Sequence, residues 1–287
     1  MKKDILRLAI QKKGRLSEKS LELLKAAGIR IDNYSQQLLV KASNFDLELL
    51  FIRDDDIPEY VQDGVADIGI VGENEILESD KSLDVVEKLG FGKCRMSLAI
   101  PKENNFKSVA DLDGKNIATS YPKILKKYLS ENNVSANVHY ISGSVEITPN
   151  INLAEAIFDI VSTGSTLTNN GLKEVEVVLK SEAVLVANKN LSSKKKSLLD
   201  EILFRTRAVN KAKDYKYILL NTPNEAIEKI SKMLPGSKSP TVIPLAMEGW
   251  SSIHTVIEEN DFWGKIDTLK NAGAEGILVL PIEKIIV

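Results

Sequence analysis

Cysteine is almost absent from this chain of 287 residues, which contains Cys94 alone. A single cysteine excludes an intramolecular disulfide and fits a reducing compartment. No apolar run approaches the ~18 residues of a membrane span. Near the N-terminus, Asp4 and Arg7 interrupt the hydrophobic core that a signal peptide needs. We therefore expect a soluble, cytoplasmic protein that has no membrane partner.

An excess of either charge is also lacking, because 38 Lys and Arg stand against 40 Asp and Glu. The cations are scattered, and the one basic run, 194–196, lies at the start of a predicted helix as a solvated face. This distribution argues against a nucleic-acid partner. With only two histidines, the chain offers no Ser-His-Asp or Cys-His arrangement and no zinc-ligand spacing. GxxxxGK[ST] and GxGxxG are absent too, which excludes a P-loop and a Rossmann fingerprint.

The segment from 153 to 171 contains the most informative pattern of the sequence. We predict a helical patch over Leu153–Ile157 and a strand over Phe158–Val161. A packet of hydroxyl residues around one glycine follows: Ser162, Thr163, Gly164, Ser165 and Thr166. Leu167 then starts a helical turn, which Asn169-Asn170-Gly171 closes in the manner of a C-cap.

A strand, a hydroxyl-and-glycine loop and the start of a helix together favour the binding of an anion. The first amide N–H groups of a helix lack internal partners, and the helix dipole adds positive potential there. Asp159, just upstream, is suited to receive sugar hydroxyls or to help hold a metal bound to pyrophosphate. The alternative is purely structural, since Ser and Thr are ordinary residues of turns and helix N-caps.

The N-terminal part alternates strands with helices. We predict a strand over 5–10, a basic turn at Lys12-Lys13-Gly14-Arg15, and a helix that Ser17 caps and Gly28 ends. A strand over 47–52 leads through three aspartates, 54–56, into a helix at Pro58. These aspartates are either a metal site or, for at least one of them, a helix cap. Alternating strands and helices imply mostly parallel sheets with ligands at their carboxyl ends.

A second candidate pocket follows in the next strand, Ala66–Gly72. Its glycines, Gly69 and Gly72, allow backbone or ligand to approach closely. Glu73 opens the next helix, so that Asp67 and Glu73 would flank a nucleotide. Strand packing with a helix N-cap is the structural alternative.

The chain divides into two lobes and a third domain by this reading. Strands over 95–100 and 182–187 are taken as the crossings between the lobes. The first lobe would then take 1–95 and 181–212, and the second 96–180. From Asp214 the order becomes βαββαβ, a ferredoxin-like unit over 213–287.

Several blocks of the sequence resemble one family in the same order. DIVSTGSTLTNNGLKEVE (Asp159 to Glu176) resembles the phosphoribosyl-pyrophosphate loop of ATP phosphoribosyltransferase, the first enzyme of histidine biosynthesis. The other blocks are RLAIQKKGRLS (Arg7 to Ser17), RDDDIP (Arg53 to Pro58), DIGIVGEN (Asp67 to Asn74), ATSYP (Ala118 to Pro122) and GSVE (Gly143 to Glu146). LVLPIEK (Leu278 to Lys284) is similar to the long form of the family, which adds a regulatory domain.

The resemblance implies an α/β fold with a two-lobed core like that of periplasmic binding proteins, plus the C-terminal ferredoxin-like regulatory domain. It implies transfer of the phosphoribosyl group to N1 of the adenine of ATP, with Mg²⁺ as cofactor and pyrophosphate as leaving group. Mg²⁺ would arrive with pyrophosphate rather than in a protein cage, with Glu146 or Asp159 as possible contacts. A competing interpretation is a solute-binding or ligand-sensing module, since the same fold serves both.

The resemblance also assigns roles to residues. Glu146 and Asp159 are the candidate catalytic carboxylates, and Asp159 and Ser162 to Thr166 bind phosphoribosyl pyrophosphate. The candidate ATP-binding residues are Lys12, Lys13, Arg15, Asp67, Gly69, Gly72, Glu73 and Tyr121. Tyr121 either stacks on the base or is a half-buried packing aromatic.

For the C-terminal domain the resemblance implies feedback inhibition by histidine and a homo-oligomer, a dimer that assembles into a hexamer. The candidate effector residues lie in LAMEGWSSIHT, between two strands: Leu245, Ala246, Ser251, Ser252 and His254. The alternatives are a polar hairpin connection here and an effector site at a domain interface instead.

Overall fold

The computed structural model describes residues 4–32, 37–234, 236 and 238–286. The chain forms two units, one of residues 1–25 and 29–200, the other of residues 26–28 and 201–287. The long helix α6 (Ser193–Lys213) passes from the first unit into the second. Each unit is described by itself below.

The first sheet of the first unit has the strand order β2-β3-β1-β4-β11-β5. Its strands are β2 (Leu39–Lys41), β3 (Leu47–Ile52), β1 (Leu6–Gln11), β4 (Ile68–Gly72), β11 (Ala183–Ala187) and β5 (Asp84–Lys88). β1 is parallel to β3 and β4, and each of the three leads into a helix: α1 (Arg15–Ala26), α2 (Ile57–Gln62) and α3 (Glu73–Ser79). The carboxyl ends of these three strands therefore meet at one edge of the sheet.

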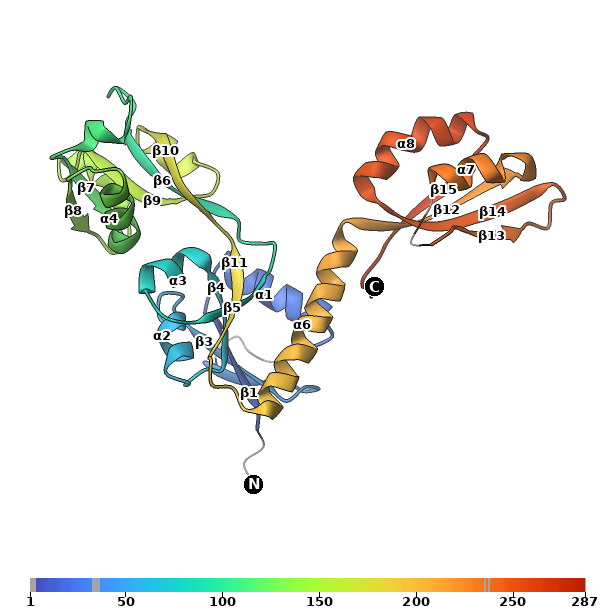
Figure 1. Cartoon of the computed structure of the whole chain (residues 1–287), viewed down its shortest axis with the longest axis horizontal. Helices are drawn as coiled ribbons and strands as arrows, with labels where there is room; N and C mark the ends of the chain where they lie inside the picture. Colours follow the sequence, from blue (N-terminus) through green and yellow to red (C-terminus); the bar gives the residue numbers. More distant parts are fainter. Residues whose placement is uncertain (1–3, 33–36, 235, 237, 287) are drawn as a thin grey trace. The chain divides into compact units, whose positions relative to one another are not determined.

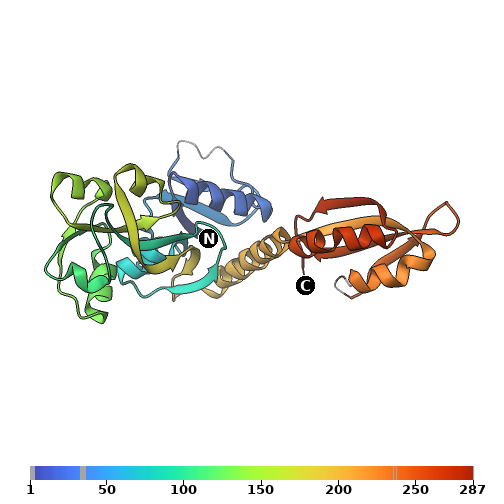
Figure 2. The same ribbon diagram turned by 90° about the horizontal axis from the view of Figure 1, so that it is seen from above.

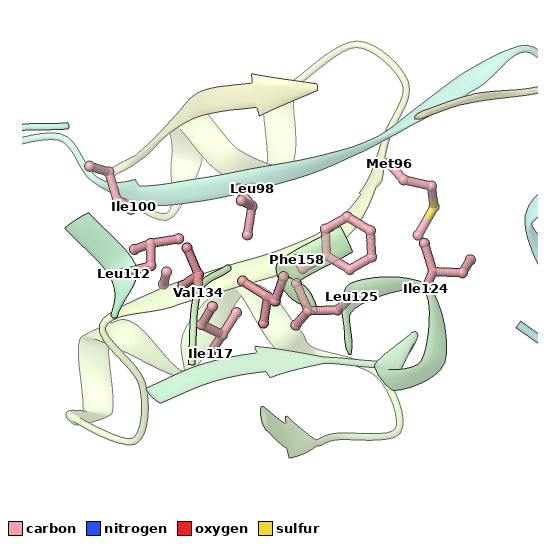
Figure 3. Close-up of a cluster of buried hydrophobic side chains, with 11 residues drawn as sticks. Met96, Leu98, Ile100, Leu112, Ile117, Ile124, Leu125, Val134 and Phe158 are labelled. Atoms are coloured by element: carbon pink, nitrogen blue, oxygen red, sulfur yellow. The ribbon is translucent and has the colours of Figure 1, made fainter. Parts of the chain in front are cut away.

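The second sheet of this unit has the order β10-β6-β9-β7-β8. Its strands are β10 (Leu172–Ser181), β6 (Cys94–Pro101), β9 (Ala156–Val161), β7 (Asn116–Thr119) and β8 (Asn137–Tyr140), with helices α4 (Pro122–Glu131) and α5 (Ser165–Asn169). Phe158 and Met96 are fully buried in the core between this sheet and α4 (Figure 3). β6 and β10 pair antiparallel along their length, so the chain enters and leaves the second sheet on neighbouring strands (Figure 1).

The second unit contains an antiparallel sheet of order β13-β14-β12-β15. In chain order its elements are β12 (Tyr215–Pro223), a short 3₁₀ turn (Asn224–Ala226), α7 (Ile227–Met233), β13 (Thr241–Pro244), β14 (Trp250–Glu258), α8 (Glu259–Asn271) and β15 (Glu275–Pro281). α7 and α8 cover the same face of this sheet (Figure 2), and Ile218, Ile253 and Leu269 are fully buried between them. The ferredoxin-like βαββαβ prediction is confirmed. The predicted domain limits, 95/96, 180/181 and 212/213, stay predictions.

Some local expectations were wrong. The predicted helix over 153–157 does not form: a 3₁₀ turn, Pro149–Ile151, ends at Asn152 in a left-handed conformation, and β9 begins at Ala156. Ser17 is not a helix cap, because α1 already begins at Arg15 and Ser17 is buried in its first turn. β10 was missed altogether, since the acidic and basic residues between its valines weaken the alternation that marks a strand.

Among the described residues, no helix combines the length and the apolarity that crossing a membrane requires.

Candidate active site

Polar side chains gather where β1, β3 and β4 end. Gln11, the last residue of β1, donates from Nε2 to Oδ2 of Asp54, 3.0 Å away, just after β3. Glu75 follows β4, in the first turn of α3. Burial raises the pKa of Glu75 most, and the negative charge of Asp54 adds to this, so the two carboxyl groups are neighbours. The carboxyl ends of three parallel strands therefore form one acidic wall.

Tyr121 approaches this wall from the second sheet. It follows β7 and is the N-cap residue of α4. Its hydroxyl donates to Oε1 of Glu75 at 2.9 Å. Burial raises the pKa of the tyrosine, and the carboxylates of Glu75, Asp159 and Asp54 raise it further. Tyr121 thus links the two sheets in the middle of an acidic cluster.

Asp159 is the second acidic centre. It lies on β9 next to Phe158, and because strand side chains alternate, it faces away from the core of Figure 3. Burial raises its pKa to about 6, and the charge of Glu146 adds to this, although the Ile160 amide donates to Oδ1 at 2.8 Å. Glu146 itself is half-buried in the short 3₁₀ turn Val145–Ile147. The structure therefore brings Asp159, Glu146 and Tyr121 together.

The hydroxyl loop begins three residues after Asp159. Ser162, Thr163, Ser165 and Thr166 are exposed, and Gly164 is in the left-handed region at φ 81°. Oγ1 of Thr163 lies 3.0 Å from Oγ of Ser165. α5 begins at Ser165, two residues earlier than predicted, and ends at Asn169, followed by Gly171 at φ 72° as the C-cap pattern predicted.

An ion pair fixes the start of this loop. Arg95 donates from Nη1 to the carbonyl oxygen of Ser162 at 3.0 Å. Glu174 accepts two hydrogen bonds from the same guanidinium group, at 2.5 and 2.6 Å, and a third from Ser97. These hydrogen bonds, chiefly those from Arg95, lower the pKa of Glu174. The hydroxyl loop is thus attached to β6 and β10.

The basic turn lies at the carboxyl end of the first sheet. Lys12, Lys13 and Arg15 are exposed, and the Lys12 amide donates to the carbonyl oxygen of Ile52 at the end of β3, 2.7 Å away. Lys12 and Lys13 also line a cavity of about 840 Å³ along α1, together with Lys25, Arg30 and others. The three cations therefore belong to the turn that directly follows Gln11, at the carboxyl end of β1.

Two predicted ATP-binding residues lie elsewhere. Asp67 precedes β4, at the opposite end from Gly72, and accepts from the Arg7 amide (2.8 Å) and from Nζ of Lys195 (2.7 Å). Its carboxylate therefore joins β1, β4 and α6. A Cβ at Gly69 would come within 2.6 Å of Ile57, so that glycine lets α2 pack against β4. Neither residue reaches the carboxyl end of the sheet, where the other candidates lie.

Gly72 and Glu73 do lie at that end. Gly72 is the N-cap residue of α3, and Glu73, its first residue, pairs with Lys88 at 3.1 Å. Sequence reasoning missed Gln11 and Glu75, and it treated Asp54 only as one of three aspartates. Asp56 is the N-cap residue of α2, although its side chain makes no capping bond, and Asp55 pairs with Arg53. The available signal was the position of each residue just after a predicted buried strand.

The candidate effector residues occupy β14 and the turn before it. Ser251 donates to Asn224 at 2.8 Å, and Oγ of Ser252 lies 3.1 Å from Nε2 of His254. The other ring nitrogen of His254 lies 2.9 Å from the hydroxyl of Tyr217. Leu245 is half-buried and Ala246 exposed, and the Leu245 amide donates to Trp250 across the turn. Ser251, Ser252 and His254 are therefore already paired with other side chains of the unit.

Two lobes of alternating strands and helices, with a hydroxyl loop and acidic clusters at the strand ends, define a periplasmic-binding-protein-like α/β core. A histidine kinase sensor domain with similarity to periplasmic binding proteins shares the fold, at a TM-score of 0.50 and 9% identity over 72% of this chain and 91% of that chain. The family model for ATP phosphoribosyltransferase matches residues 53–208, and the model for the HisG C-terminal domain matches residues 212–284. The chain belongs to the ATP phosphoribosyltransferase family, in its long form with the C-terminal domain.

Its relatives are similar to this chain in sequence over nearly the whole length. The ATP phosphoribosyltransferases of Cytophaga hutchinsonii and Phocaeicola vulgatus are 59% and 57% identical to it, over 98% of this chain and 99% and 100% of theirs. A solved ATP phosphoribosyl transferase (HisG:HisZ) complex from Thermotoga maritima matches with a TM-score of 0.61 and 30% identity. That match covers 71% of this chain and 99% of the other. The chain is thus a transferase of the first step of histidine biosynthesis.

Proposed function

We propose that the enzyme joins N1 of the adenine of ATP to the anomeric carbon of phosphoribosyl pyrophosphate and releases pyrophosphate. The C–O bond to pyrophosphate breaks as the C–N bond forms, and the triphosphate of ATP stays intact. The observation that carries this proposal is the hydroxyl loop Ser162–Thr166 placed directly after Asp159 and held by Arg95. A loop of exposed hydroxyls and amides suits the 5′-phosphate, and a carboxylate beside it suits the ribose hydroxyls.

Other residues of the site have further roles in the proposed reaction. Lys12, Lys13 and Arg15 neutralise the phosphates of ATP or the leaving pyrophosphate. Tyr121 offers an aromatic face for the adenine, with its hydroxyl held by Glu75. Asp159 and Glu146 stabilise the positive charge that develops on the ribose ring. Holding the two reactants in line supplies much of the rate.

The residues present fit a Mg²⁺ ion that arrives with pyrophosphate. Glu146 and Asp159 offer carboxylate oxygens, with Glu146 close enough for its charge to raise the pKa of Asp159, and oxygen is the ligand type that Mg²⁺ prefers. Within the described ranges no group of three or more His, Cys, Asp or Glu is placed to hold an ion. The other ligands would therefore be substrate oxygens and water. When bound, Mg²⁺ neutralises charge on the leaving pyrophosphate.

An assay of pyrophosphate release tests the reaction. We expect release only when both ATP and phosphoribosyl pyrophosphate are present, and a product that keeps three phosphates on the adenosine. EDTA should abolish turnover while the melting temperature without substrate stays unchanged, because the ion belongs to the substrate complex. Release with either substrate alone, or ADP as a product, would refute the proposal.

The C-terminal unit has a separate proposed task, feedback inhibition by histidine with assembly into a dimer and a hexamer. Every substrate residue named above lies before residue 201, so the ferredoxin-like unit is free for another role. The Thermotoga maritima relative is described as a HisG:HisZ complex, which supports assembly with further chains. Inhibition requires histidine to bind one state of the enzyme better than another, with a coupling of ~1–3 kcal/mol typical.

Deleting residues 213–287 should therefore remove histidine inhibition. We expect residual activity from the remaining chain, lowered where the oligomer is disturbed, and no response to histidine in the same pyrophosphate assay. A companion variant in the full-length chain, Ser251→Ala, should weaken inhibition by histidine and keep the activity measured without histidine. This change removes one hydroxyl of the candidate effector segment and leaves the sheet in place. An active truncated enzyme with unchanged inhibition would place the effector site in the first unit.

A further inference from the structure

α4 begins without a cap of its own. Its N-cap residue, Tyr121, makes no side-chain capping bond, and Pro122 occupies the first helical turn. The first amide N–H groups of a helix need acceptors from elsewhere. Glu78 of α3 supplies them, although α3 belongs to the other sheet of the unit. Its Oε1 accepts from the Lys123 amide at 3.0 Å, and its Oε2 accepts from the amides of Lys123 and Ile124 at 3.1 and 3.0 Å.

Two further bonds join the same two helices. Nζ of Lys123 donates to the carbonyl oxygen of Ser79 at 3.1 Å, and the Tyr121 hydroxyl donates to Glu75 at 2.9 Å. Glu75 and Glu78 are three residues apart, which places them on one face of α3. We call this set of bonds between Glu75, Glu78 and the start of α4 (121–124) the clasp. The clasp is a direct contact between the sheet that carries the basic turn and the sheet that carries the hydroxyl loop; a second contact joins Asn74 of α3 to Ser181 of β10.

We propose that Glu78 and Glu75 are positioning residues, which hold the two lobes of the first unit at the separation that in-line transfer requires. The proposal rests on the two-substrate reaction proposed above. Neither carboxylate is needed to touch a substrate for this role. If the clasp opens, the basic turn and the hydroxyl loop separate, and only the closed fraction of molecules binds both substrates productively.

The closure of the clasp also depends on whether Glu75 is protonated. The groups that face it are Tyr121, Asn74, Asp54, Asp55 and Glu78, with Cys94 close enough to be influenced by its charge. Burial, followed by the charges of the three carboxylates, raises the pKa of Glu75 to about 7, against the opposing effect of the Tyr121 hydrogen bond. The closed clasp therefore binds a proton more tightly than a state in which water reaches Glu75. By linkage, closure is favoured at low pH and weakens as the pH rises from about 5 to about 7.

Kinetics of three variants test the positioning role. A smaller closed fraction raises the KM for each substrate by the same factor when the other is kept well below saturation, because both depend on the same closure. For Glu78→Gln, which keeps one acceptor, we expect about a threefold rise in both KM values. For Glu78→Ala we expect about a tenfold rise in both, the size of one charge-assisted bond that is partly screened by water. The control Glu59→Gln breaks the Lys81 pair on α2 and should change neither.

Hydrogen exchange measures the clasp without any turnover. In the full-length protein without substrates, the peptide over 121–126 should lose protection at least severalfold in Glu78→Ala and keep it in Glu59→Gln. Protection in the wild type, corrected for intrinsic exchange, should fall as the pH rises from about 5 to about 7 and then level off, whereas Glu75→Gln should remove this pH dependence. Unchanged protection in Glu78→Ala, or a rise in only one KM value, would refute the clasp. An inactive wild-type protein with the expected exchange pattern would refute only the proposed reaction.

Discussion

Gly164→Val is expected to raise the KM for phosphoribosyl pyrophosphate by about ten- to a hundredfold and to leave the KM for ATP within about twofold. Gly164 has φ 81°, a region that a β-branched residue reaches only at a cost of ~1–3 kcal/mol. The nearest atom to an added Cβ is Cγ1 of Val161 at 3.9 Å, so the cost comes from the backbone and not from a clash. The loop would leave this conformation, and its amides and hydroxyls would no longer face one anion.

A second glycine of the same segment provides the matched control. Gly171 has φ 72° and open space around it, but it follows α5 instead of preceding it. Gly171→Val should therefore cost similar backbone strain and lower the melting temperature similarly, with little change in either KM value. Thr163→Ala should give a smaller rise for phosphoribosyl pyrophosphate, because it removes the hydroxyl that lies 3.0 Å from Ser165. Equal KM changes in both glycine variants would contradict the assignment of the loop.

The sequence predicts well those parts of the fold that local patterns determine. The hydroxyl loop, the Gly171 cap and the βαββαβ unit depend on periodicity and turn residues within short segments, and the structure has them. β10 was missed because its pairing with β6 joins residues about 80 positions apart, and tertiary pairing compensates for a weak local pattern. Leu153–Ile157 failed as a helix for a similar reason, since Ile157 pairs with Ala99 in a sheet.

The same difference between local patterns and long-range contacts applies to the residues of the candidate site. Asp159 and Tyr121 could be proposed from the sequence because each follows or lies in a recognisable strand beside a distinctive motif, and their roles stay predictions. Asp67 lies before β4 and is bound by Lys195, 128 positions away, a pairing that no local pattern indicates; its contact with ATP stays a prediction. Glu75 looked like an ordinary residue of an exposed helix. Only the approach of Tyr121, 46 positions further on, makes it part of the acidic cluster between the two sheets.

Asp159→Asn is expected to lose activity and to gain stability. The folded protein raises the pKa of Asp159 from 3.8 to about 6, first by burial and then through the charge of Glu146. A raised pKa means that the folded state binds the proton more tightly than the unfolded chain, so ionisation of Asp159 destabilises the fold as the pH rises from about 4 to about 6. Above pH 6 this cost is complete and amounts to as much as about 3 kcal/mol. Asparagine is neutral at every pH, so the variant does not carry this cost of ionisation.

Thermal unfolding of Asp159→Asn should therefore show a melting temperature several degrees above that of the wild type at pH 7, at ~2–4 °C per kcal/mol, and no difference at pH 3.5. Turnover should fall by about a hundredfold or more, because an amide neither accepts the ribose hydroxyls as strongly nor stabilises positive charge on the ring.

In the wild type, kcat/KM should decline as the pH falls through about 6. Glu146→Gln should move this decline to lower pH, since the charge of Glu146 helps to raise the pKa of Asp159. Active sites hold such unfavourable charges because the substrate needs them. A variant that keeps wild-type turnover, or that melts lower at pH 7, would show that Asp159 is an ordinary structural carboxylate.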